Sequence, residues 1–226
     1  MLAASATGRL HGCEVEPARY ADTVATDDSN PFATRFTRPG AIPYAFAEAS
    51  DVDRLVLRLK ELAWWGQIVG PHGSGKSTLL HALQPALEAQ ARDVVWFTQS
   101  QGERRLETTA GEAASWNAAT QVIVDGYEQL GWLARRWLKQ MCRRQQSGLL
   151  VTTHEDVGLP LLWTTARDET LAQRLVGELL SDEQRQWISA EDVSRCYQQH
   201  AGNLRETLFD LYDLYERRRH RPSSGS

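Results

Sequence analysis

Residues 70–77 of this chain read Gly-Pro-His-Gly-Ser-Gly-Lys-Ser, and they restrict its fold more than any other stretch. The glycines allow backbone N–H groups to turn inward as an anion-binding nest, and the lysine that follows adds a positive charge. The apolar residues 66–69 before the loop are typical of a strand, and residues 77–83 after it are typical of a helix. We therefore expect a phosphate-binding loop at the start of a helix.

This interpretation assigns specific contacts to the last two residues of the loop. Lys76 would reach the β- and γ-phosphates of a nucleotide, and the hydroxyl of Ser77 would be placed for Mg²⁺. The alternative is a glycine-rich turn without a ligand, and the flanking strand and helix favour the phosphate loop over it. The expected phosphate-contacting set is Gly70, Pro71, His72, Gly73, Ser74, Gly75, Lys76, Ser77 and Thr78.

A second site residue follows a later apolar run. Residues 121–124 read Gln-Val-Ile-Val and lead into Asp125. A carboxylate at the end of a buried strand can hold Mg²⁺ through its water shell, which is the acidic partner that a phosphate loop needs. The alternative is that Asp125 only begins a turn with Gly126. With the loop upstream we favour the metal role, so Ser77 and Asp125 are the predicted metal residues.

The order of the apolar runs predicts an α/β fold. Runs at 66–69, 93–100, 121–126, 148–154 and 158–165 read as strands separated by helix-like stretches. Pro85 is expected to end or kink the helix after the loop. We expect a P-loop NTPase fold, a three-layer α/β/α arrangement with a mainly parallel five-stranded sheet. Helices at 168–180, 189–200 and 203–219, with no further strand, would form a small helical lid.

This pattern predicts five segments. They are a disordered or loosely attached arm (1–30), a strap and leading helix (31–65), the P-loop NTPase core (66–166), the helical lid (167–219) and a flexible tail (220–226). The strap is rich in proline and aromatic residues and is expected to lie extended across the surface of the domain. It would pack on its own core or be the place where a partner docks.

The chain resembles AAA+ ATPases, within the additional-strand class of P-loop ATPases. The resemblance rests on the loop, on the strand ending in Asp125, on the strand ending in Thr152 and Thr153, and on the Gly-Asn-Leu-Arg-Glu run at 202–206. It implies that Arg205 opens a lid helix and faces the phosphates, and that Thr152 or Thr153 senses the nucleotide. Simpler roles stay open: strand-end hydroxyls that bond the backbone, and an ordinary residue in the first turn of a helix.

One departure from that family concerns hydrolysis. Such ATPases usually follow the metal-binding aspartate with a glutamate that orients the attacking water, whereas here the next residue is Gly126. Glu128 is the nearest carboxylate and the first candidate for this task, and Glu155 is the second. If neither reaches the phosphate, the site would bind ATP and hydrolyse it slowly. Nucleotide binding is therefore better supported than hydrolysis.

Two other resemblances remain as alternatives. The loop and residues 149–155 are also similar to ABC-type ATPases, which implies that His154 contacts the γ-phosphate. Only 23 residues separate Lys76 from Ser100, however, which leaves no room for the helical subdomain that carries the ABC signature. Residues 124–129 resemble the Asp-Gly turn of nucleotide kinases, but no phosphate lid or acceptor pocket is evident.

Basic residues on the helix after Asp125 suggest partners. Arg135, Lys139 and Arg143 recur at every fourth position, which describes either a solvated helix face or a contact with a nucleic-acid backbone or a neighbouring subunit's nucleotide. The AAA+ resemblance also implies a homo-oligomer in which an arginine from the next subunit completes the site. Arg167 and Arg174 are the candidates for that arginine.

Composition sets the remaining expectations. The net charge of −4 gives no general sign of nucleic-acid or membrane binding, and no apolar run is long enough for a membrane span. Three widely spaced cysteines indicate a reducing, cytoplasmic location. We expect an ATPase with ATP and Mg²⁺ as cofactors, whose lid movement remodels or signals to an unidentified protein partner. The alternative is a nucleotide-dependent binding switch with little hydrolysis.

Overall fold

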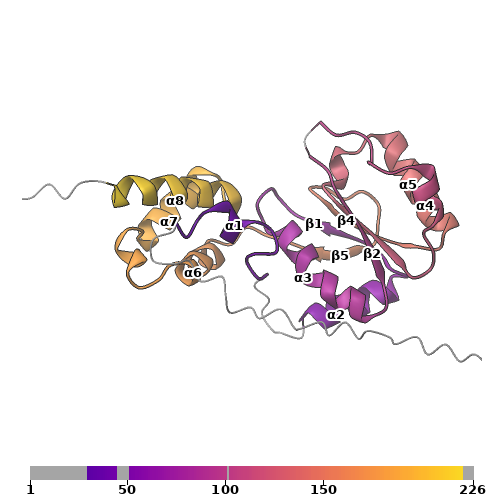
Figure 1. Cartoon of the computed structure of the whole chain (residues 1–226), viewed down its shortest axis with the longest axis horizontal. Helices are drawn as coiled ribbons and strands as arrows, with labels where there is room; N and C mark the ends of the chain where they lie inside the picture. The colour runs from indigo at the N-terminus through magenta and orange to yellow at the C-terminus, as the bar shows by residue number, and fades with distance from the viewer. Residues whose placement is uncertain (1–29, 45–50, 101, 221–226) are drawn as a thin grey trace, which may run out of the picture.

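The computed structural model of the chain describes residues 30–44, 51–100 and 102–220. Its centre is a five-stranded sheet in which all the strand pairs are parallel, in the order β2-β3-β4-β1-β5 (Figure 1). The strands are β1 (Trp65–Val69), β2 (Asp93–Thr98), β3 (Thr120–Asp125), β4 (Gly148–Thr153) and β5 (Leu161–Thr164). The expected five-stranded parallel sheet is therefore confirmed.

Helices cover both faces of this sheet, because the central strands are apolar on both sides. Ile123 and Leu150 pack in one buried cluster with α2 (Asp51–Glu61) and α3 (Lys76–Ala89). Their neighbours Val122 and Val151 point to the opposite face and pack with α4 (Ala110–Ala114) and α5 (Trp132–Arg144). This alternation follows from the two-residue period of a strand. The result is a three-layer α/β arrangement.

Pro85 was expected to end or kink the helix after the loop, and it does not end it. Pro85 lies inside α3; it is exposed, and the flanking Leu83 and Leu87 are fully buried, so packing holds the helix together across the proline. The stretch before β3 contains the short helix α4, which is capped by Thr109 and Glu112. After β3 the chain forms the 3₁₀ turn η1 (Tyr127–Gln129), and α5 follows.

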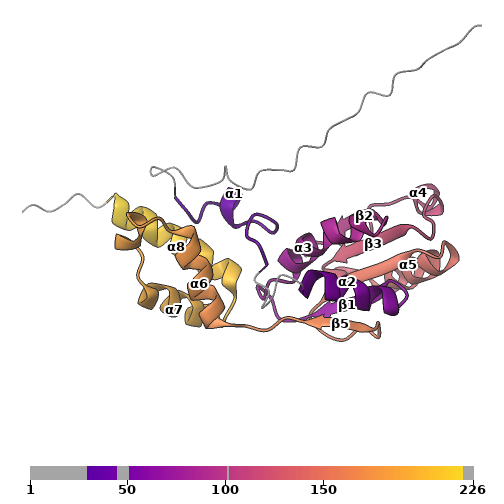
Figure 2. The ribbon, with the colours of Figure 1, turned by 90° about the horizontal axis from the view of Figure 1, so that it is seen from below.

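Residues after β5 form a separate helical lobe with its own buried cluster (Figure 2). It consists of α6 (Glu169–Leu179), the 3₁₀ turn η2 (Gln184–Gln186), α7 (Ala190–Gln199) and α8 (Leu204–Arg219). The three α-helices were expected from the sequence, whereas η2 was not. Ser189 and Asp192 form a capping box at the start of α7. The carboxylate of Asp192 is buried and accepts hydrogen bonds from Arg195 and Arg218, which tie α7 to the end of α8.

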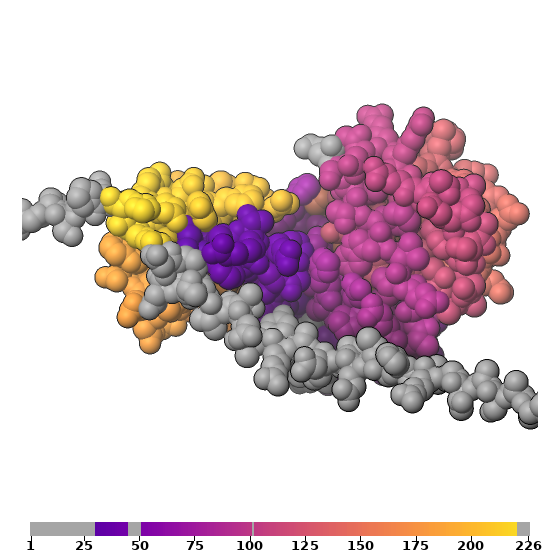
Figure 3. Space-filling view, in the orientation of Figure 1, coloured from indigo at the N-terminus to yellow at the C-terminus, as the bar shows by residue number. Residues whose placement is uncertain are grey.

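The described part of the strap, residues 30–44, lies between the two lobes (Figure 3). It contains one helical turn, α1 (Thr34–Thr37). Phe32 is buried in the cluster of the helical lobe, edge-on to Tyr215, and Tyr44 packs against the cluster beside α3. The strap therefore joins the lobes by its own packing. Residues 1–29 of the arm, residues 45–46 of the strap and residues 221–226 of the tail lie outside the described residues. None of the described helices is long and apolar enough to cross a membrane.

Candidate functional site

The loop 70–77 connects β1 to α3 at the carboxyl end of the sheet. Gly75, in a left-handed conformation, caps α3, and Lys76 is the first helical residue. Gly73 also has a positive φ of 69°. The hydroxyl of Ser74 lies 2.6 Å from that of Thr165, just after β5, and donates to the Pro71 carbonyl. The backbone N–H groups at the start of α3 therefore border the loop, as an anion nest requires.

The Lys76 side chain lies along the loop. Its ammonium donates hydrogen bonds to the carbonyl oxygens of Gly70 and Pro71, at 2.6 and 2.8 Å, and the residue is 9% exposed. Burial lowers the pKa of Lys76, whereas the negative charges of Glu128 and Asp125 act to raise it. Lys76 thus shares one electrostatic environment with Asp125 and Glu128, although it is far from both in the sequence.

Asp125 is held by the neighbouring strand. The Thr152 hydroxyl donates to Asp125 Oδ1 at 2.6 Å and accepts a hydrogen bond from the Gly126 N–H at 2.8 Å. The Thr153 hydroxyl instead donates to the carbonyl of Glu155 at 2.8 Å. Of the two expected sensor threonines, only Thr152 contacts the predicted metal carboxylate. No hydrogen bond joins Ser77 to Asp125 among the described residues, although Ser77 lies at the start of α3 and Asp125 at the end of β3.

Gly126 has no room for the glutamate found at this position in the resembling families. Its φ is +83°, and a Cβ atom there would lie 2.7 Å from the carbonyl oxygen of Gln99, at the end of β2. The Gln99 N–H donates to the carbonyl of Asp125 at 2.8 Å, which keeps these two backbones close. The backbone at this position therefore explains why a glycine, and not a glutamate, follows Asp125.

Glu128 and His154 form a pair beside the loop. Glu128 lies in the turn η1, and its Oε1 is 2.7 Å from His154 Nε2, whereas its buried Oε2 has no hydrogen-bond partner. The ring of His154 also packs against that of His72 in the loop, with 3.6 Å between centroids. Arg135 fixes the turn by donating to the Glu128 carbonyl at 2.6 Å. Glu155, the second candidate, is exposed in the loop after β4.

The pKa of His154 lies below its usual value. Burial is the main cause, the positive charge of Lys76 and the nearby His72 act in the same direction, and Glu128 opposes them. These surroundings therefore favour the neutral imidazole, which lies within hydrogen-bond distance of Glu128.

The helical lobe reaches the loop through Asn203, which caps α8 by accepting from the N–H groups of Arg205 and Glu206. A Cβ atom on Gly73 would lie 2.6 Å from Asn203 Cγ, so the two residues are in close contact. Arg205, the expected phosphate sensor, is exposed, and its guanidinium lies over the ring of Phe209 at 5.8 Å.

The two arginines expected to serve a neighbouring subunit have different surroundings. Arg167 is exposed, and a Cβ atom on Gly202 would lie 2.5 Å from its Cδ, so its stem covers the turn before α8. Arg174 lies on α6 with its Nε 3.9 Å from Glu178. Only Arg167 lies next to the Gly-Asn turn that contacts the loop.

Sequence analysis missed the contribution of Tyr44. A Cβ atom on Gly75 would lie 3.4 Å from its ring, and the Trp163 indole donates to its hydroxyl at 3.3 Å. The proline- and aromatic-rich composition of the strap was noticeable, but no sequence signal linked it to the loop. Thr165, which meets Ser74, had no signal either.

The residues present fit a nucleotide with its metal ion. No group of three or more His, Cys, Asp or Glu side chains in the described ranges could hold a metal by itself. Mg²⁺ usually takes one or two carboxylates and completes its shell with phosphate oxygens and water. Asp125 and the hydroxyl of Ser77 suit that arrangement, and the unpaired Glu128 Oε2 offers a further buried acceptor.

No protein-family model matches the chain, and no curated protein matches it significantly.

Proposed function

We propose that this chain is an AAA+-like P-loop ATPase that binds ATP with Mg²⁺ at the loop 70–77. The observation that carries the proposal is the shared environment of Lys76, Asp125 and Glu128 at one edge of the sheet. Parallel strands bring their carboxyl ends to the same edge, which is where α/β proteins bind ligands.

The strand order supports the additional-strand class. β4 lies between β1, which leads into the loop, and β3, which ends in Asp125. Thr152, at the end of this inserted strand, bonds Asp125 from the side of the loop. In this proposal Thr152 positions the metal carboxylate, and the helical lobe is the lid whose Asn203 meets the loop.

The residues of the site would share the work of hydrolysis. Lys76 would exchange its two carbonyl partners for the β- and γ-phosphates, and Asp125 and Ser77 would hold the metal. Bound Mg²⁺ would neutralise charge on the phosphates. Glu128 would take a proton from the attacking water at its free Oε2, while His154 holds Oε1; the products are ADP and phosphate.

A second candidate is a nucleotide-dependent switch with little hydrolysis. It is favoured by the backbone at Gly126, which excludes a glutamate directly after Asp125, and by the engagement of Glu128 with His154. In that case ATP would close the lid on the loop and a protein partner would bind the closed state. An ABC-type ATPase or a small-acceptor kinase is less favoured, and a kinase would form ADP only when an acceptor is added.

The deciding experiment measures Mg·ATP binding and steady-state phosphate release on the full chain. The variants are Lys76→Ala, Glu128→Gln and, as a matched control, Glu155→Gln. Loss of binding in Lys76→Ala, with turnover lost in Glu128→Gln and kept in Glu155→Gln, supports the ATPase. Tight binding that is lost in Lys76→Ala, with negligible turnover in every form, supports the switch. Binding that survives in Lys76→Ala contradicts both.

The proposal includes a cytoplasmic location and a homo-oligomer that acts on an unidentified protein partner. Cys142 and Cys196 are buried free thiols, which suits a reducing compartment, whereas Cys13 lies outside the described residues.

A further inference from the structure

A concave cavity of about 1090 Å³ lies between α5 and the residues that follow β4. Residues of α5 form one wall, and residues 153–157 form the other. Glu128 and His154 line its inner end, but no residue of the loop 70–77 does. The cavity, which we call the α5 groove, therefore adjoins the proposed nucleotide site and shares only Glu128 and His154 with it.

The α5 wall of this groove is strongly basic. Five of its side chains carry positive charge, and none of them forms an ion pair within the described part of the chain; they are Arg135, Arg136, Lys139, Arg143 and Arg144. The charged atoms lie close enough that Arg143 and Arg135 lower the pKa of Lys139, after the larger effect of burial. Like charges held together without carboxylates favour an anionic ligand.

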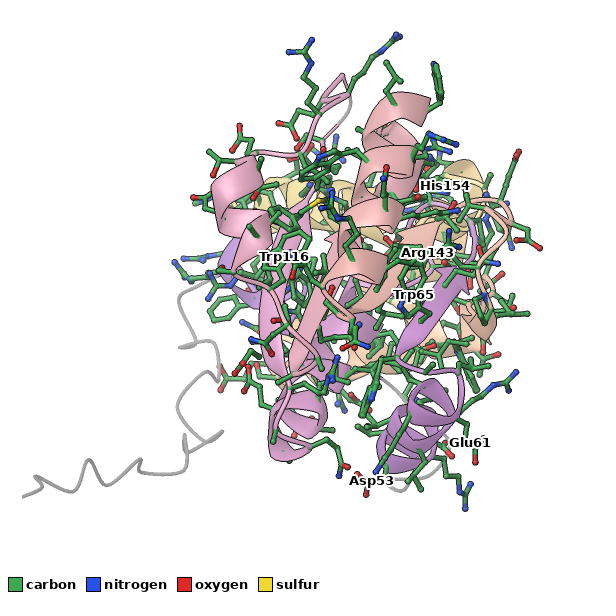
Figure 4. The ribbon with its side chains drawn as sticks, turned by 90° about the vertical axis from the view of Figure 1, so that its right-hand side faces the viewer. Asp53, Glu61, Trp65, Trp116, Arg143 and His154 are labelled. Atoms are coloured by element: carbon green, nitrogen blue, oxygen red, sulfur yellow. The ribbon has the colours of Figure 1, made fainter. Side chains whose placement is uncertain are left out.

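Three of the five cations lie over aromatic rings. Arg143 lies over the ring of Trp65 at 5.5 Å, and Arg135 and Lys139 lie over that of Tyr127 at 5.3 and 6.0 Å. In Figure 4 the labelled Arg143 and Trp65 lie next to each other, with His154 on the same side of the molecule. Arg136, Arg143 and Arg144 are exposed. The wall thus combines cations positioned over rings with exposed cations that can reach a ligand.

A large indole stands at the start of the basic row. Trp132 lines the groove with 72% of its surface exposed. Arg143 follows Arg135 by eight positions along the helix, a distance of about 12 Å. With a rise of roughly 3.4 Å per nucleotide of a stacked strand, such a row spans three to four phosphates, and Trp132 lies one turn beyond it.

The opposite wall carries acceptors. Glu155 is exposed, and Asp156 accepts hydrogen bonds from Gln67 and the Gly158 N–H, which keep its pKa below the usual value. Carboxylates accept hydrogen bonds from the amino groups of bases, whereas the carboxylate side chains of an acidic peptide offer them no donor. An exposed aromatic ring, a basic row and facing acceptors match base stacking, phosphate binding and base-edge contacts together.

We propose that the α5 groove binds single-stranded nucleic acid, with Trp132 stacking on a base and the arginines of α5 contacting phosphates. The site does not depend on nucleotide binding at the loop. The second wall closes the groove on one side, which suits a single strand better than a duplex.

The test is fluorescence anisotropy of a labelled oligothymidylate of about 15 nucleotides, titrated with the full chain without nucleotide at several salt concentrations. Arg136→Ala/Arg144→Ala removes two exposed phosphate contacts. It should weaken binding at least tenfold and reduce the slope of log K against log salt by about 1.4. Trp132→Ala should weaken binding on the order of tenfold and leave that slope unchanged, and Trp132→Phe should restore affinity.

The matched control is Lys60→Ala/Arg217→Ala, which removes the same charge from exposed positions on α2 and α8, outside the groove. Unchanged affinity in the control supports the groove, and equal losses in both pairs overturn it. Tighter binding of a duplex of the same length also overturns it. The proposal is also overturned if polyglutamate binds as tightly as the oligonucleotide and Trp132→Ala does not change the affinity for polyglutamate. The groove would then hold an acidic protein segment. Lys76→Ala should bind the oligonucleotide normally, which separates this result from failure of the proposed ATPase.

Discussion

Asn203, which caps α8, lies against Gly73 in the middle of the loop 70–77: a Cβ atom on Gly73 would fall 2.9 Å from Asn203 Cα. These residues are far apart in the sequence, and their contact joins the helical lobe to the loop. A ligand that reshapes the loop would also move the start of α8. The contact would therefore couple the proposed lid movement to the loop at one point.

Gly73→Ala should destabilise the protein by about 2–4 kcal/mol, because the alanine must adopt a positive φ and also displace Asn203. The matched control is Gly158→Ala. Gly158 has a similar φ of +73° but nothing within 4 Å of an added Cβ, so only the backbone cost of about 1–2 kcal/mol applies. Urea unfolding measures the free energy of unfolding of the two variants. An equal decrease in both would show that displacing Asn203 adds no cost at Gly73.

Thr152→Val should leave Asp125 Oδ1 and the Gly126 N–H without their shared partner, and cost about 1–3 kcal/mol. Mg·ATP affinity and turnover should fall as well, since Asp125 loses its fixed orientation, and Thr152→Ser should restore them. Thr153→Val is the matched control, because its hydroxyl bonds only the backbone of Glu155. Calorimetric titration with Mg·ATP compares the affinities of the three variants, and Thr152→Val should bind most weakly.

The lowered pKa of His154 predicts a pH dependence of stability. Below pH 6.5 the unfolded chain binds a proton at this position more readily than the folded chain, so acid favours unfolding. The free energy of unfolding should rise with pH up to about 6.5 and then level off. The measurement is urea unfolding across pH for the native chain and for His154→Gln, which should lose this part of the slope. Parallel curves would contradict the assignment.

Asp192 should be needed for the helical lobe. Burial acts to raise its pKa, but hydrogen bonds from Arg218, the Ser189 N–H and Arg195 lower the pKa by more. Since the folded pKa is depressed, the stabilisation is present above pH 4 and is lost as the pH falls below the unfolded value. Asp192→Asn should cost about 2–3 kcal/mol at pH 7. Asp182→Asn, at a fully exposed pair with Arg185, should cost almost nothing.

Arg167→Ala should lower ATP turnover more than Arg174→Ala. The stem of Arg167 covers Gly202, directly before the residue that meets the loop, whereas Arg174 is paired with Glu178 on the surface of α6. Phosphate release per subunit, measured with the oligomeric state by light scattering, compares the two variants. Unchanged turnover in both variants of an oligomeric protein would exclude either arginine as the residue that completes a neighbouring site.

Local patterns in the sequence were sufficient for much of the fold. The loop 70–77, the five strands and the three late helices could be predicted because each depends on the side-chain period and end signals of a few neighbouring residues, such as Ser189 and Asp192. The same patterns predicted that Pro85 would end or kink its helix, yet α3 continues past it. There the burial of the neighbouring Leu83 and Leu87 decided the outcome.

The contacts that define the site depended on tertiary structure. The sequence identified Glu128, His154 and Asn203 separately, but only the fold placed Glu128 Oε1 at His154 and Asn203 at Gly73. The α5 groove likewise needs α5 and residues 153–157 to face each other. A sequence reveals which residues share a helix face or strand end, because that geometry is local. Which of those faces meet is decided by the packing of the whole chain.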